Sequence, residues 1–471
     1  MIDQQQEIQT LFERQQRHAP KMEQTTAKER VERLRRLEKF LLDDQKMQGL
    51  FDALDRDFRK SPAEVLLSEI AVAVQHLRHT RRSLARWMMP RRVPTPLLLT
   101  GTSSYIQYEP KGVCLIIAPW NYPFNLAISP LIDAIAAGNT AIIKPSEMSA
   151  NTSAFIKKML GELFPPEEVA VVECDAATAT ALLQLPFNHI FFTGSPKIGK
   201  IIMAAAAKNL ASVTLELGGK SPAIIDETAN VRTIAYRLAW GKLLNKGQTC
   251  IAPDYVIIHE SRLKEFLGAF QSAVKKLYGE GEIAENRDYC RIINQNHFQR
   301  LRNLYEDAMA KGAREEMGGN WNKADCFIPP TVLTNITEDM DISQEEIFGP
   351  ILPVVTYTSP EEAVRIVNHR PKPLTLYVSS RNKKFSDYIL KNTSSGGAVV
   401  NDFMLGFGNP DLGFGGINNS GIGNYMGFSG FQEFSNPKSV VYRHFLDMSV
   451  IFPPYNSRVI KMLNAIKRWF A

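Results

Sequence analysis

The chain has 471 residues, of which 44% are hydrophobic and 22% charged, close to the usage of ordinary globular proteins. This composition excludes a largely disordered chain. The 29 glycines and 27 prolines have no collagen-like period, which excludes a fibrous protein, and a net charge of +6 is too small to indicate a nucleic-acid partner. At roughly 150 residues per domain, about three domains are expected.

The cysteines and the N-terminal residues indicate the compartment. The five cysteines include no Cys-x-x-Cys pair and their number is odd, which argues against a disulfide framework and against a metal site. The N-terminal residues lack the apolar segment of a secretory signal. No run of about 18 apolar residues predicts a membrane span. We therefore expect a cytoplasmic protein in a reducing setting, with no metal.

The first hundred residues are predicted to be helical. Apolar residues recur at helical spacing from Thr26 to Arg59, which predicts a helix there. A second helix is expected to begin at Ser61, where a capping serine is followed by Pro62 and by Glu64 in a capping-box position. This helix runs towards Trp87, and the prolines that follow end it.

From Gly112 onward, the sequence alternates between short apolar runs and segments with helical spacing. Such apolar runs are typical of strands buried on both faces. The expected strands are Val113–Ala118, Thr140–Lys144, Val169–Glu173 and His189–Phe192, and the expected helices are Leu126–Ala137, Phe155–Leu163, Ala177–Leu183 and Pro196–Ala207. This order predicts a parallel sheet with right-handed crossovers, and such sheets bind ligands at the carboxyl ends of their strands.

A second alternating region is predicted after Val213. Its strands are expected at Val213–Leu217, Ala223–Ile225 and Tyr255–His259, which indicates a second α/β domain. The stretch from Asn401 to Gly430 contains nine glycines and few charges. A flexible linker is one interpretation of this composition, but its four phenylalanines favour an ordered glycine-rich loop.

Two turns after predicted strands carry residues that suit a dinucleotide. Gly194 permits a tight turn, and the helix start after Ser195 offers free N–H groups and a positive dipole end to an anion. The segment lacks the G-x-G-x-x-G pattern, so taken alone an ordinary strand-to-helix turn is the commoner explanation. Lys144 is placed to reach ribose hydroxyls and Glu147 to oppose an added phosphate, although a surface turn would also explain both.

Three further side chains next to turns have reactive or polar groups. Cys250 lies in a loop after a helix, and a thiolate is the strongest nucleophile that a side chain offers near neutral pH. Glu216 ends a strand beside two glycines, and Asn121 follows the first buried strand, where its amide would suit a developing oxyanion. Taken singly, a buried structural cysteine, a surface acid and a turn-forming asparagine are the commoner explanations. Together these residues describe a cofactor domain with an amide donor, a carboxylate and a thiol.

Seven ordered segments carry a resemblance to a known family. They read PWNYPF, KPSE, FTGSPKIGK, LELGGKSP, GQTCIAPD, EEIFGP and NDFMLGFGNPDLGFGG, and they span roughly residues 100 to 440. In these segments the chain resembles the aldehyde dehydrogenase superfamily. GQTCIAPDY, ILPVV and NDFMLGF are similar to its class 3 branch, the fatty and aromatic aldehyde dehydrogenases. Glu216 precedes Cys250 by 34 residues, which also resembles the family's spacing.

The resemblance implies an α/β fold with a Rossmann-like parallel-sheet NAD(P)-binding domain, a second α/β catalytic domain and a small oligomerisation arm. The implied boundaries are 1–94 and 111–213 for the N-terminal helices and NAD(P)-binding domain, 214–424 for the catalytic domain, 95–110 and 425–443 for the arm, and 444–471 for a C-terminal tail. The implied substrate is a small-molecule aldehyde, either aliphatic with a medium or long chain or aromatic. The implied protein partner is a second copy of the chain in a homodimer.

The resemblance also implies residue roles. Cys250 would attack the aldehyde carbon, Asn121 and the backbone N–H of Cys250 would hold the oxyanion, and Glu216 would activate water to release the carboxylic acid. The implied cofactor is NAD, with NADP as the alternative. The residues implied to bind it are Lys144, Glu147, Gly194, Ser195, Gly199, Leu217, Glu346 and Phe348.

Two other functions stay open. A coenzyme A-acylating enzyme of the same fold would have no need of Glu216 as a base for water, and a silent binding protein would have no need of the complete catalytic set. One departure from many relatives is Lys246, four residues before Cys250. An ammonium there would lower the pKa of the thiol, but we expect Lys246 to face solvent.

The C-terminal tail is predicted to end in an amphipathic helix. Pro453 and Pro454 interrupt the chain, and Ser457 is placed to cap a new helix. Val459, Leu463, Ile466 and Phe470 then form one apolar stripe, opposite a basic face. We expect this helix to dock on its own subunit near the aldehyde entrance. A partner subunit and peripheral contact with an anionic membrane, which would make the protein membrane-associated, are the alternatives.

Overall fold

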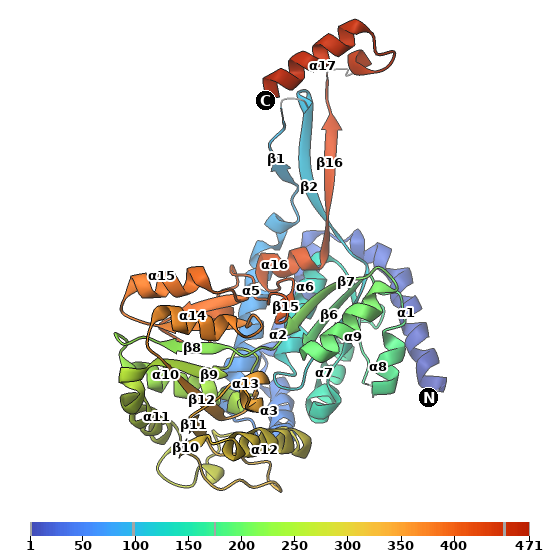
Figure 1. Ribbon diagram of the computed structural model, residues 1–471. Helices are drawn as coiled ribbons and strands as arrows, with labels where there is room; N and C mark the ends of the chain where they lie inside the picture. The colour runs from blue at the N-terminus through green and yellow to red at the C-terminus, as the bar shows by residue number, and fades with distance from the viewer. Residues whose placement is uncertain (1, 97–98, 174–175, 446–448, 471) are drawn as a thin grey trace.

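The computed structural model describes residues 2–96, 99–173, 176–445 and 449–470, and its N-terminal part is helical (Figure 1). These helices are α1 (Ile2–Glu23), α2 (Ala27–Leu41), α3 (Asp44–Phe58), α4 (Pro62–Val65), the π-helical turn η1 (Leu66–Ile70) and α5 (Ala71–Trp87). The prediction of one helix from Thr26 to Arg59 is wrong. Thr26 and Glu29 form the capping box that starts α2, and the carboxylate of Asp43 accepts from the Lys46 N–H to start α3.

The first large sheet has the strand order β15-β7-β6-β3-β4-β5. Its strands are β3 (Val113–Ile117), β4 (Thr140–Lys144), β5 (Val169–Val171), β6 (His189–Gly194), β7 (Ser212–Leu217) and β15 (Gly421–Ile422). Helices α6 (Asn125–Ala137), α7 (Ala150–Leu163), α8 (Ala176–Leu182) and α9 (Pro196–Ala207) connect them. All neighbours are parallel except β15 and β7, so the predicted parallel sheet with helical crossovers is confirmed.

Strand β7 belongs to this first sheet. It pairs in parallel with β6, so that Thr193 lies opposite Glu216 and Gly194 opposite Leu217. The prediction that the segment from Val213 to Leu217 opens the second α/β region is therefore wrong, because a strand's apolar run predicts that the strand exists and not which neighbour it pairs with.

The second large sheet has the order β10-β11-β12-β9-β8-β13-β14. Its strands are β8 (Pro222–Ile225), β9 (Tyr255–His259), β10 (Arg314–Met317), β11 (Thr331–Thr334), β12 (Ile351–Tyr357), β13 (Thr375–Ser379) and β14 (Gly397–Val400). The accompanying helices are α10 (Val231–Leu243), η4 (Leu244–Gly247), η5 (Glu260–Arg262), α11 (Leu263–Tyr278), η6 (Ile283–Glu285), α12 (Gln295–Ala310), α13 (Asp341–Gln344), α14 (Pro360–Asn368) and α15 (Lys383–Asn392). Only β10 runs antiparallel to its neighbour among these strands.

A small antiparallel sheet projects from the body as an arm (Figure 1). It consists of β1 (Arg91–Val93), β2 (Thr102–Pro110) and β16 (Ser435–Arg443), and most of its residues are partly or fully exposed. The glycine-rich stretch leads into this arm through η7 (Leu405–Phe407), β15 and α16 (Gly427–Glu433). Because β15 is hydrogen-bonded to β7 beside Glu216, this stretch is an ordered part of the first sheet and not a linker.

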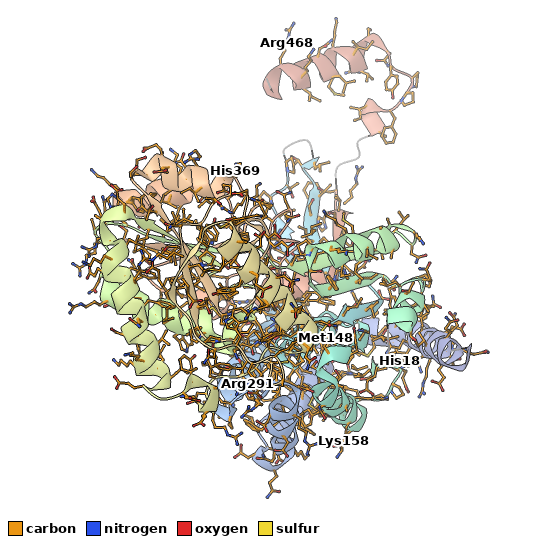
Figure 2. The ribbon with its side chains drawn as sticks, turned by 60° about the horizontal axis from the view of Figure 1, so that its bottom comes forward. His18, Met148, Lys158, Arg291, His369 and Arg468 are labelled. Atoms are coloured by element: carbon orange, nitrogen blue, oxygen red, sulfur yellow. The ribbon has the colours of Figure 1, made fainter. Side chains whose placement is uncertain are left out.

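The tail forms a short turn, η8 (Ser449–Ile451), and helix α17 (Ser457–Phe470), which confirms the predicted helix. Figure 1 places α17 at the far end of the arm, and in Figure 2 Arg468 lies well apart from the two sheets. The expectation that α17 docks on its own subunit near the active site is therefore wrong. Among the described residues, no helix has the length and apolar character needed to cross a membrane.

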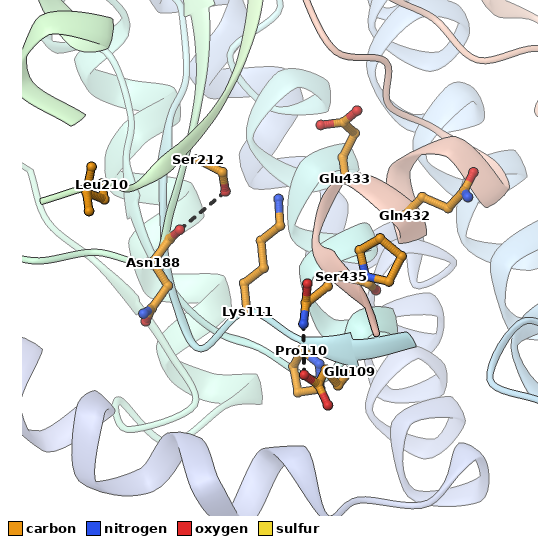
Figure 3. A pocket seen from close by; sticks show the side chains of 11 residues that line it. Glu109, Pro110, Lys111, Asn188, Leu210, Ser212, Gln432, Glu433 and Ser435 are labelled. Carbon is orange, nitrogen blue, oxygen red and sulfur yellow. Dashed lines mark hydrogen bonds between the residues drawn. The ribbon is translucent and has the colours of Figure 1, made fainter. Parts of the chain in front are cut away.

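A pocket of about 750 Å³ lies where the arm leaves the first sheet (Figure 3). Lys111, Asn188 and Ser212 line it, and these residues lie at the starts of β3, β6 and β7. Ligands of parallel sheets bind at the other end, beyond the carboxyl ends of the strands. The candidate active site is therefore expected, and found, at the opposite edge from this pocket.

Candidate active site

A tight turn after α10 carries Cys250. Asn245, Lys246 and Gly247 all have left-handed backbone conformations, with φ of 50°, 58° and 73°. At Gly247 an added Cβ would lie 2.4 Å from the backbone oxygen of Gly349, so only glycine fits this close approach. The turn reverses the chain at the end of the helix and places Cys250 at the junction of the two large sheets.

Asn121 lies beside this turn. It follows β3 and is 3% exposed, and its Nδ2 donates to the backbone oxygen of Gln248 at 3.0 Å. The next residue strengthens the link, because the hydroxyls of Tyr122 and Thr249 are hydrogen-bonded at 2.7 Å. The structure therefore brings the predicted amide donor to within two residues of the predicted nucleophile along the facing chain.

Glu216 is buried near the end of β7. It is 3% exposed, and neither carboxylate oxygen has a hydrogen-bond partner among the described residues. Burial, followed by the negative charge of Glu433, raises the pKa of Glu216 well above its ordinary value. A carboxyl without a fixed partner can release its proton to a molecule that enters the site and, once ionised, can accept a proton from one.

The thiol of Cys250 is perturbed in the same direction. Desolvation raises its pKa to about 12, and the carboxylates of Glu346 and Glu216 contribute further. These electrostatic effects place both carboxylates close enough to interact with the sulfur. Without ligands the thiol is therefore protonated near neutral pH, and its proton must be removed before it can act as a nucleophile.

Lys246 does not lower the pKa of Cys250. Its side chain is fully buried and points to another part of the second domain, where Nζ donates to the backbone oxygen of Cys290 at 3.1 Å. The ammonium lies 4.4 Å from the ring centre of Tyr289 and 4.5 Å from that of Phe327. The expectation that Lys246 faces solvent is wrong, because two aromatic faces and a carbonyl replace water around it.

The start of α9 lies at the carboxyl edge of the first sheet. The hydroxyl of Ser195 caps the helix by accepting from the Ile198 N–H at 3.4 Å. An added Cβ at Gly199 would lie 2.8 Å from the side chain of Leu217, so glycine allows α9 to pack closely on β7. At Gly194 an added Cβ would lie 2.4 Å from the ring of Phe192.

Lys144 ends β4 at the same edge, next to the end of β3. Its Nζ forms an ion pair with Glu147 at 2.5 Å, in which the lysine side chain is 9% exposed and the glutamate 51%. The pair therefore presents a cation and an anion to any ligand that crosses this turn.

These features fit the dinucleotide that the resemblance implies. The hydroxyl of Thr193, at the end of β6, is buried and has no hydrogen-bond partner among the described residues. Ile198 and Ile201 on α9 are 42% and 53% exposed, which offers an apolar surface beside the helix start. An anion-binding helix terminus, an unpartnered hydroxyl and exposed apolar side chains together suit a phosphate-linked ligand with a planar base.

Glu346 lies between the two sheets. Its carboxylate accepts from the Gly219 N–H, and an added Cβ at Gly218 would lie within 2.1 Å of Oε2. Burial raises the pKa of Glu346 to about 8, and the neighbouring Asp254 contributes to this increase. Phe348 has a left-handed φ of 51°, and its ring meets Trp120 edge to face at 5.4 Å. Phe348 therefore lies next to the turn that bears Asn121, and Glu346 lies against the loop after β7.

Two buried amides that were not predicted hold the turn before Cys250. Asn245 Nδ2 donates to the backbone oxygens of Asn121 and Gln248, at 2.9 and 3.1 Å. Gln248 Nε2 donates to Asn245 and Arg291 backbone oxygens, and its Oε1 accepts from the Ile293 N–H. An Asn-x-Gly sequence signals left-handed backbone, and this signal was available in the sequence. Within the described residues, no cluster of His, Cys, Asp and Glu could hold a metal ion.

Comparisons with known proteins agree on one family. The sequence profile described as "Aldehyde dehydrogenase family" matches residues 2–440. The 4,4'-diaponeurosporen-aldehyde dehydrogenase of Staphylococcus aureus is 41% identical over 430 residues, covering 91% of this chain and 92% of that protein. Aldehyde dehydrogenase family 3 member B1 of Homo sapiens is 40% identical over 437 residues, covering 92% of each. The structure titled "Substrate bound state of Staphylococcus Aureus AldH" superposes with a TM-score of 0.92 and 40% identity, over 98% of this chain and 99% of that one.

Proposed function

From the premise that this chain belongs to the aldehyde dehydrogenase family, we propose how its own residues perform the family's reaction. The protein is an NAD(P)-dependent aldehyde dehydrogenase, which oxidises aldehydes to carboxylic acids. One observation carries the assignment of residues. An amide donor, a buried carboxyl without a partner and a thiol converge at the junction of the two sheets.

In the proposed mechanism, the thiol of Cys250 first loses its proton to solvent water, and the resulting thiolate adds to the carbonyl carbon of the aldehyde. The carbonyl oxygen becomes an oxyanion, which the Nδ2 of Asn121 and the backbone N–H of Cys250 stabilise. NAD or NADP, when bound, would accept the hydride that leaves the adduct carbon as the oxyanion re-forms a carbonyl, and the acyl group would remain on Cys250 as a thioester. Glu216, once its own proton has left to solvent, takes a proton from water, and the resulting hydroxide adds to the thioester carbon, displaces the thiolate and releases the acid.

For the cofactor we propose NAD, with NADP bound more weakly. Ser195 and Gly194 would hold the pyrophosphate at the start of α9, and Glu346 would accept from the hydroxyls of the nicotinamide ribose. Gly199 and Leu217 support this terminus through their close packing, and Phe348 shapes the nicotinamide end. Lys144 would donate to the adenosine ribose, while Glu147 would repel a phosphate on that ribose.

For the substrate we propose medium- or long-chain aliphatic or aromatic aldehydes. The support comes from relatives whose names state such substrates, including a probable coniferyl aldehyde dehydrogenase of Pseudomonas aeruginosa that is 40% identical over 462 residues. The decisive measurement is an activity panel with short, medium, long and aromatic aldehydes, each with NAD and with NADP. A preference for short aldehydes would overturn this proposal.

The same panel separates the proposed hydrolysis from acyl transfer to coenzyme A. Stoichiometric formation of the carboxylic acid without coenzyme A is expected, because Glu216 is placed to activate water. Product formation that requires coenzyme A would favour the acylating alternative. Labelling of Cys250 by a reactive aldehyde analogue is expected, and failure to label would favour a silent binding protein.

For the assembly we propose a homodimer in the cytoplasm, formed through the arm. The dimeric state is stated in the name of a Mus musculus relative, the aldehyde dehydrogenase "dimeric NADP-preferring", which is 39% identical over 414 residues. The arm leaves Val441 and Tyr442 each 58% exposed, and such side chains suit a protein interface. We propose the domain boundaries given above with three changes. The NAD(P)-binding domain extends through Leu217 and includes β15, because β7 and β15 belong to its sheet, and the arm includes β1.

A further inference from the structure

A fully buried ion pair lies beneath the turn that carries Asn121. Lys60, which precedes α4, donates from Nζ to Glu69 Oε1 at 2.8 Å, and both side chains are completely inaccessible to solvent. Burying two charges costs more free energy than an apolar pair of similar volume, so stability alone is a weak reason for such a pair. The contacts of the two side chains indicate another role.

The ion pair holds both ends of the turn after β3. Lys60 Nζ lies 3.5 Å from the backbone oxygen of Asn121 and 4.0 Å from the ring centre of Tyr122. The other oxygen of Glu69 accepts from the backbone N–H of Asn125 at 2.8 Å, where α6 begins. The segment from Asn121 to Asn125 is therefore fixed at its first and last residues by the two partners of one ion pair.

The inward position of Glu69 depends on a local irregularity of the helix. Glu69 lies in the π-helical turn η1, which interrupts the α-helix between Val65 and Ala71. A π-turn adds a residue to the helical repeat, and such turns are frequent at functional sites. Here it leaves Leu66 and Leu67 about half exposed and turns Glu69 fully inward. The sequence thus leaves apolar side chains in solvent while it buries a carboxylate.

The carbonyl of Asn121 also receives the turn that carries the nucleophile. Its oxygen accepts from Asn245 Nδ2 at 2.9 Å, in addition to the approach of Lys60. The N-terminal helices also contact the turn before Cys250 directly, because the carboxylate of Glu64 accepts from the Asn245 N–H at 3.3 Å. A shift of the Asn121 peptide would therefore change the distance between its side-chain amide and Cys250.

The geometry points to Lys60 and Glu69 as positioning residues that orient the Asn121 amide towards the oxyanion formed at Cys250. This inference rests on the proposed role of Asn121 as the oxyanion donor. The two residues touch neither substrate nor cofactor and act only through the turn between them. Loss of an oxyanion donor lowers rates by about 10²–10³-fold, so misplacement of the donor is expected to cost about 10- to 100-fold.

The test replaces the charged pair by a neutral one of similar shape, Lys60→Met with Glu69→Gln. The glutamine keeps an oxygen that accepts from the Asn125 N–H. The variant loses the two charges, the hydrogen bond between them and the contacts of the ammonium with the Asn121 carbonyl and the Tyr122 ring. We expect the melting temperature and the KM for NAD to stay close to the parent values, while the rate of the pre-steady-state NADH burst falls about 10- to 100-fold. A burst rate within twofold of the parent would overturn the inference.

A cycle with Asn121→Ala separates the positioning role from general damage. If the ion pair acts through Asn121, then adding Lys60→Met and Glu69→Gln to the Asn121→Ala enzyme lowers the burst rate no further. A full additional loss in that background would contradict positioning through Asn121. An Asn121→Ala enzyme with a parental burst rate would instead overturn the proposed oxyanion role, so the two failures are distinguishable.

Two further variants control for folding. Arg33→Met with Glu168→Gln neutralises another ion pair of the same domain, 2.8 Å long and 17% and 11% exposed, far along the chain from the active site. This enzyme is expected to keep the parental burst rate. If the Lys60→Met and Glu69→Gln enzyme does not fold, Glu69→Asp keeps both charges but is one methylene too short to reach both Lys60 and Asn125, and its burst rate is expected to fall by a smaller factor. A parental rate in that single variant would also count against the inference.

Discussion

At the residue scale, burial controls the chemistry of the candidate site. Glu216 and Cys250 both lie in surroundings that disfavour their charged forms, and the carboxylate of Glu216 adds to the increase in the pKa of Cys250. The free enzyme is therefore expected to hold both groups protonated, and a reactive thiolate forms only when the proton leaves the pair. Two measurements follow from the position of Glu216.

The first measurement separates the role of the Cys250 thiol in acylation from the role of the Glu216 carboxyl in hydrolysis. Cys250→Ser is expected to abolish aldehyde oxidation, because the hydroxyl is a far weaker nucleophile at neutral pH. Glu216→Gln is expected to keep acylation and lose hydrolysis. Rapid mixing of that variant with aldehyde and NAD should give an NADH burst near one equivalent per active site, followed by turnover at least about 10²-fold slower. Normal steady turnover would remove Glu216 from the mechanism.

The second is the effect of Glu216 on stability as a function of pH. Its pKa is raised on folding, so the unfolded chain releases this proton at lower pH than the folded one. The contribution of Glu216 to the free energy of unfolding is therefore fully present below the pKa of the unfolded chain, near 4.5. It is lost as the pH rises towards the pKa of the folded protein, at about 1.4 kcal/mol per pH unit. Glu216→Gln should therefore resist urea better than the parent at pH 8 and equally well at pH 4.5. Equal midpoints at both pH values would contradict a neutral, buried Glu216.

At the element scale, the sequence predicts elements well where local chemistry decides them. The strand Val113–Ile117 and the helix Pro196–Ala207 were predictable, because a continuous apolar run and a Ser-Pro helix start are local signals. The break between α2 and α3 was not predictable, because the apolar residues keep their helical spacing through it and the N-cap Asp43 does not interrupt that pattern. The burial of Lys246 was also unpredictable, since its aromatic partners lie more than 40 residues away along the chain.

The turn after β4 allows a test of cofactor choice. Lys144 is held by Glu147, whose carboxylate is half exposed and would repel a phosphate on the adenosine ribose. Glu147→Gln is expected to raise kcat/KM with NADP relative to NAD by about 3- to 10-fold, because the ammonium is released and the repulsion removed. Glu162→Gln, an exposed acid on α7, serves as the matched control and should leave the ratio unchanged. An unchanged ratio in Glu147→Gln would show that this turn does not discriminate the two cofactors.

At the scale of the whole molecule, the candidate active site depends on three separate parts of the chain. The N-terminal helices supply Lys60, Glu64 and Glu69 beneath it, the first sheet supplies Asn121 and Glu216, and the second domain supplies Cys250. Sequence motifs identified the last two groups, because the reacting residues lie in them. The supporting helices carry no such motif, and only the folded contacts reveal their link to the site.

The helix of the C-terminal tail, α17, has apolar side chains that its own subunit does not cover. Val459 is buried and Met462 and Ile466 are partly buried, but Ile460 and Leu463 on the same helix remain 51% and 40% exposed. Because α17 lies at the end of an arm that we propose to form the dimer, its uncovered apolar side chains are expected to rest on the partner subunit. A basic face on the same helix makes an anionic membrane the competing surface.

Removal of residues 456–471 decides between these two surfaces. If α17 rests on the partner subunit beside its aldehyde entrance, truncation should raise KM for long-chain aldehydes several-fold and leave KM for short ones unchanged. Ile460→Ser with Leu463→Ser, which keeps every positive charge of the helix, should have the same effect. Neither the parent nor the variants should sediment with phosphatidylglycerol vesicles. Parent protein that sediments with the vesicles, together with a truncated enzyme that does not and whose kinetics are unchanged, would instead identify α17 as a membrane-surface anchor.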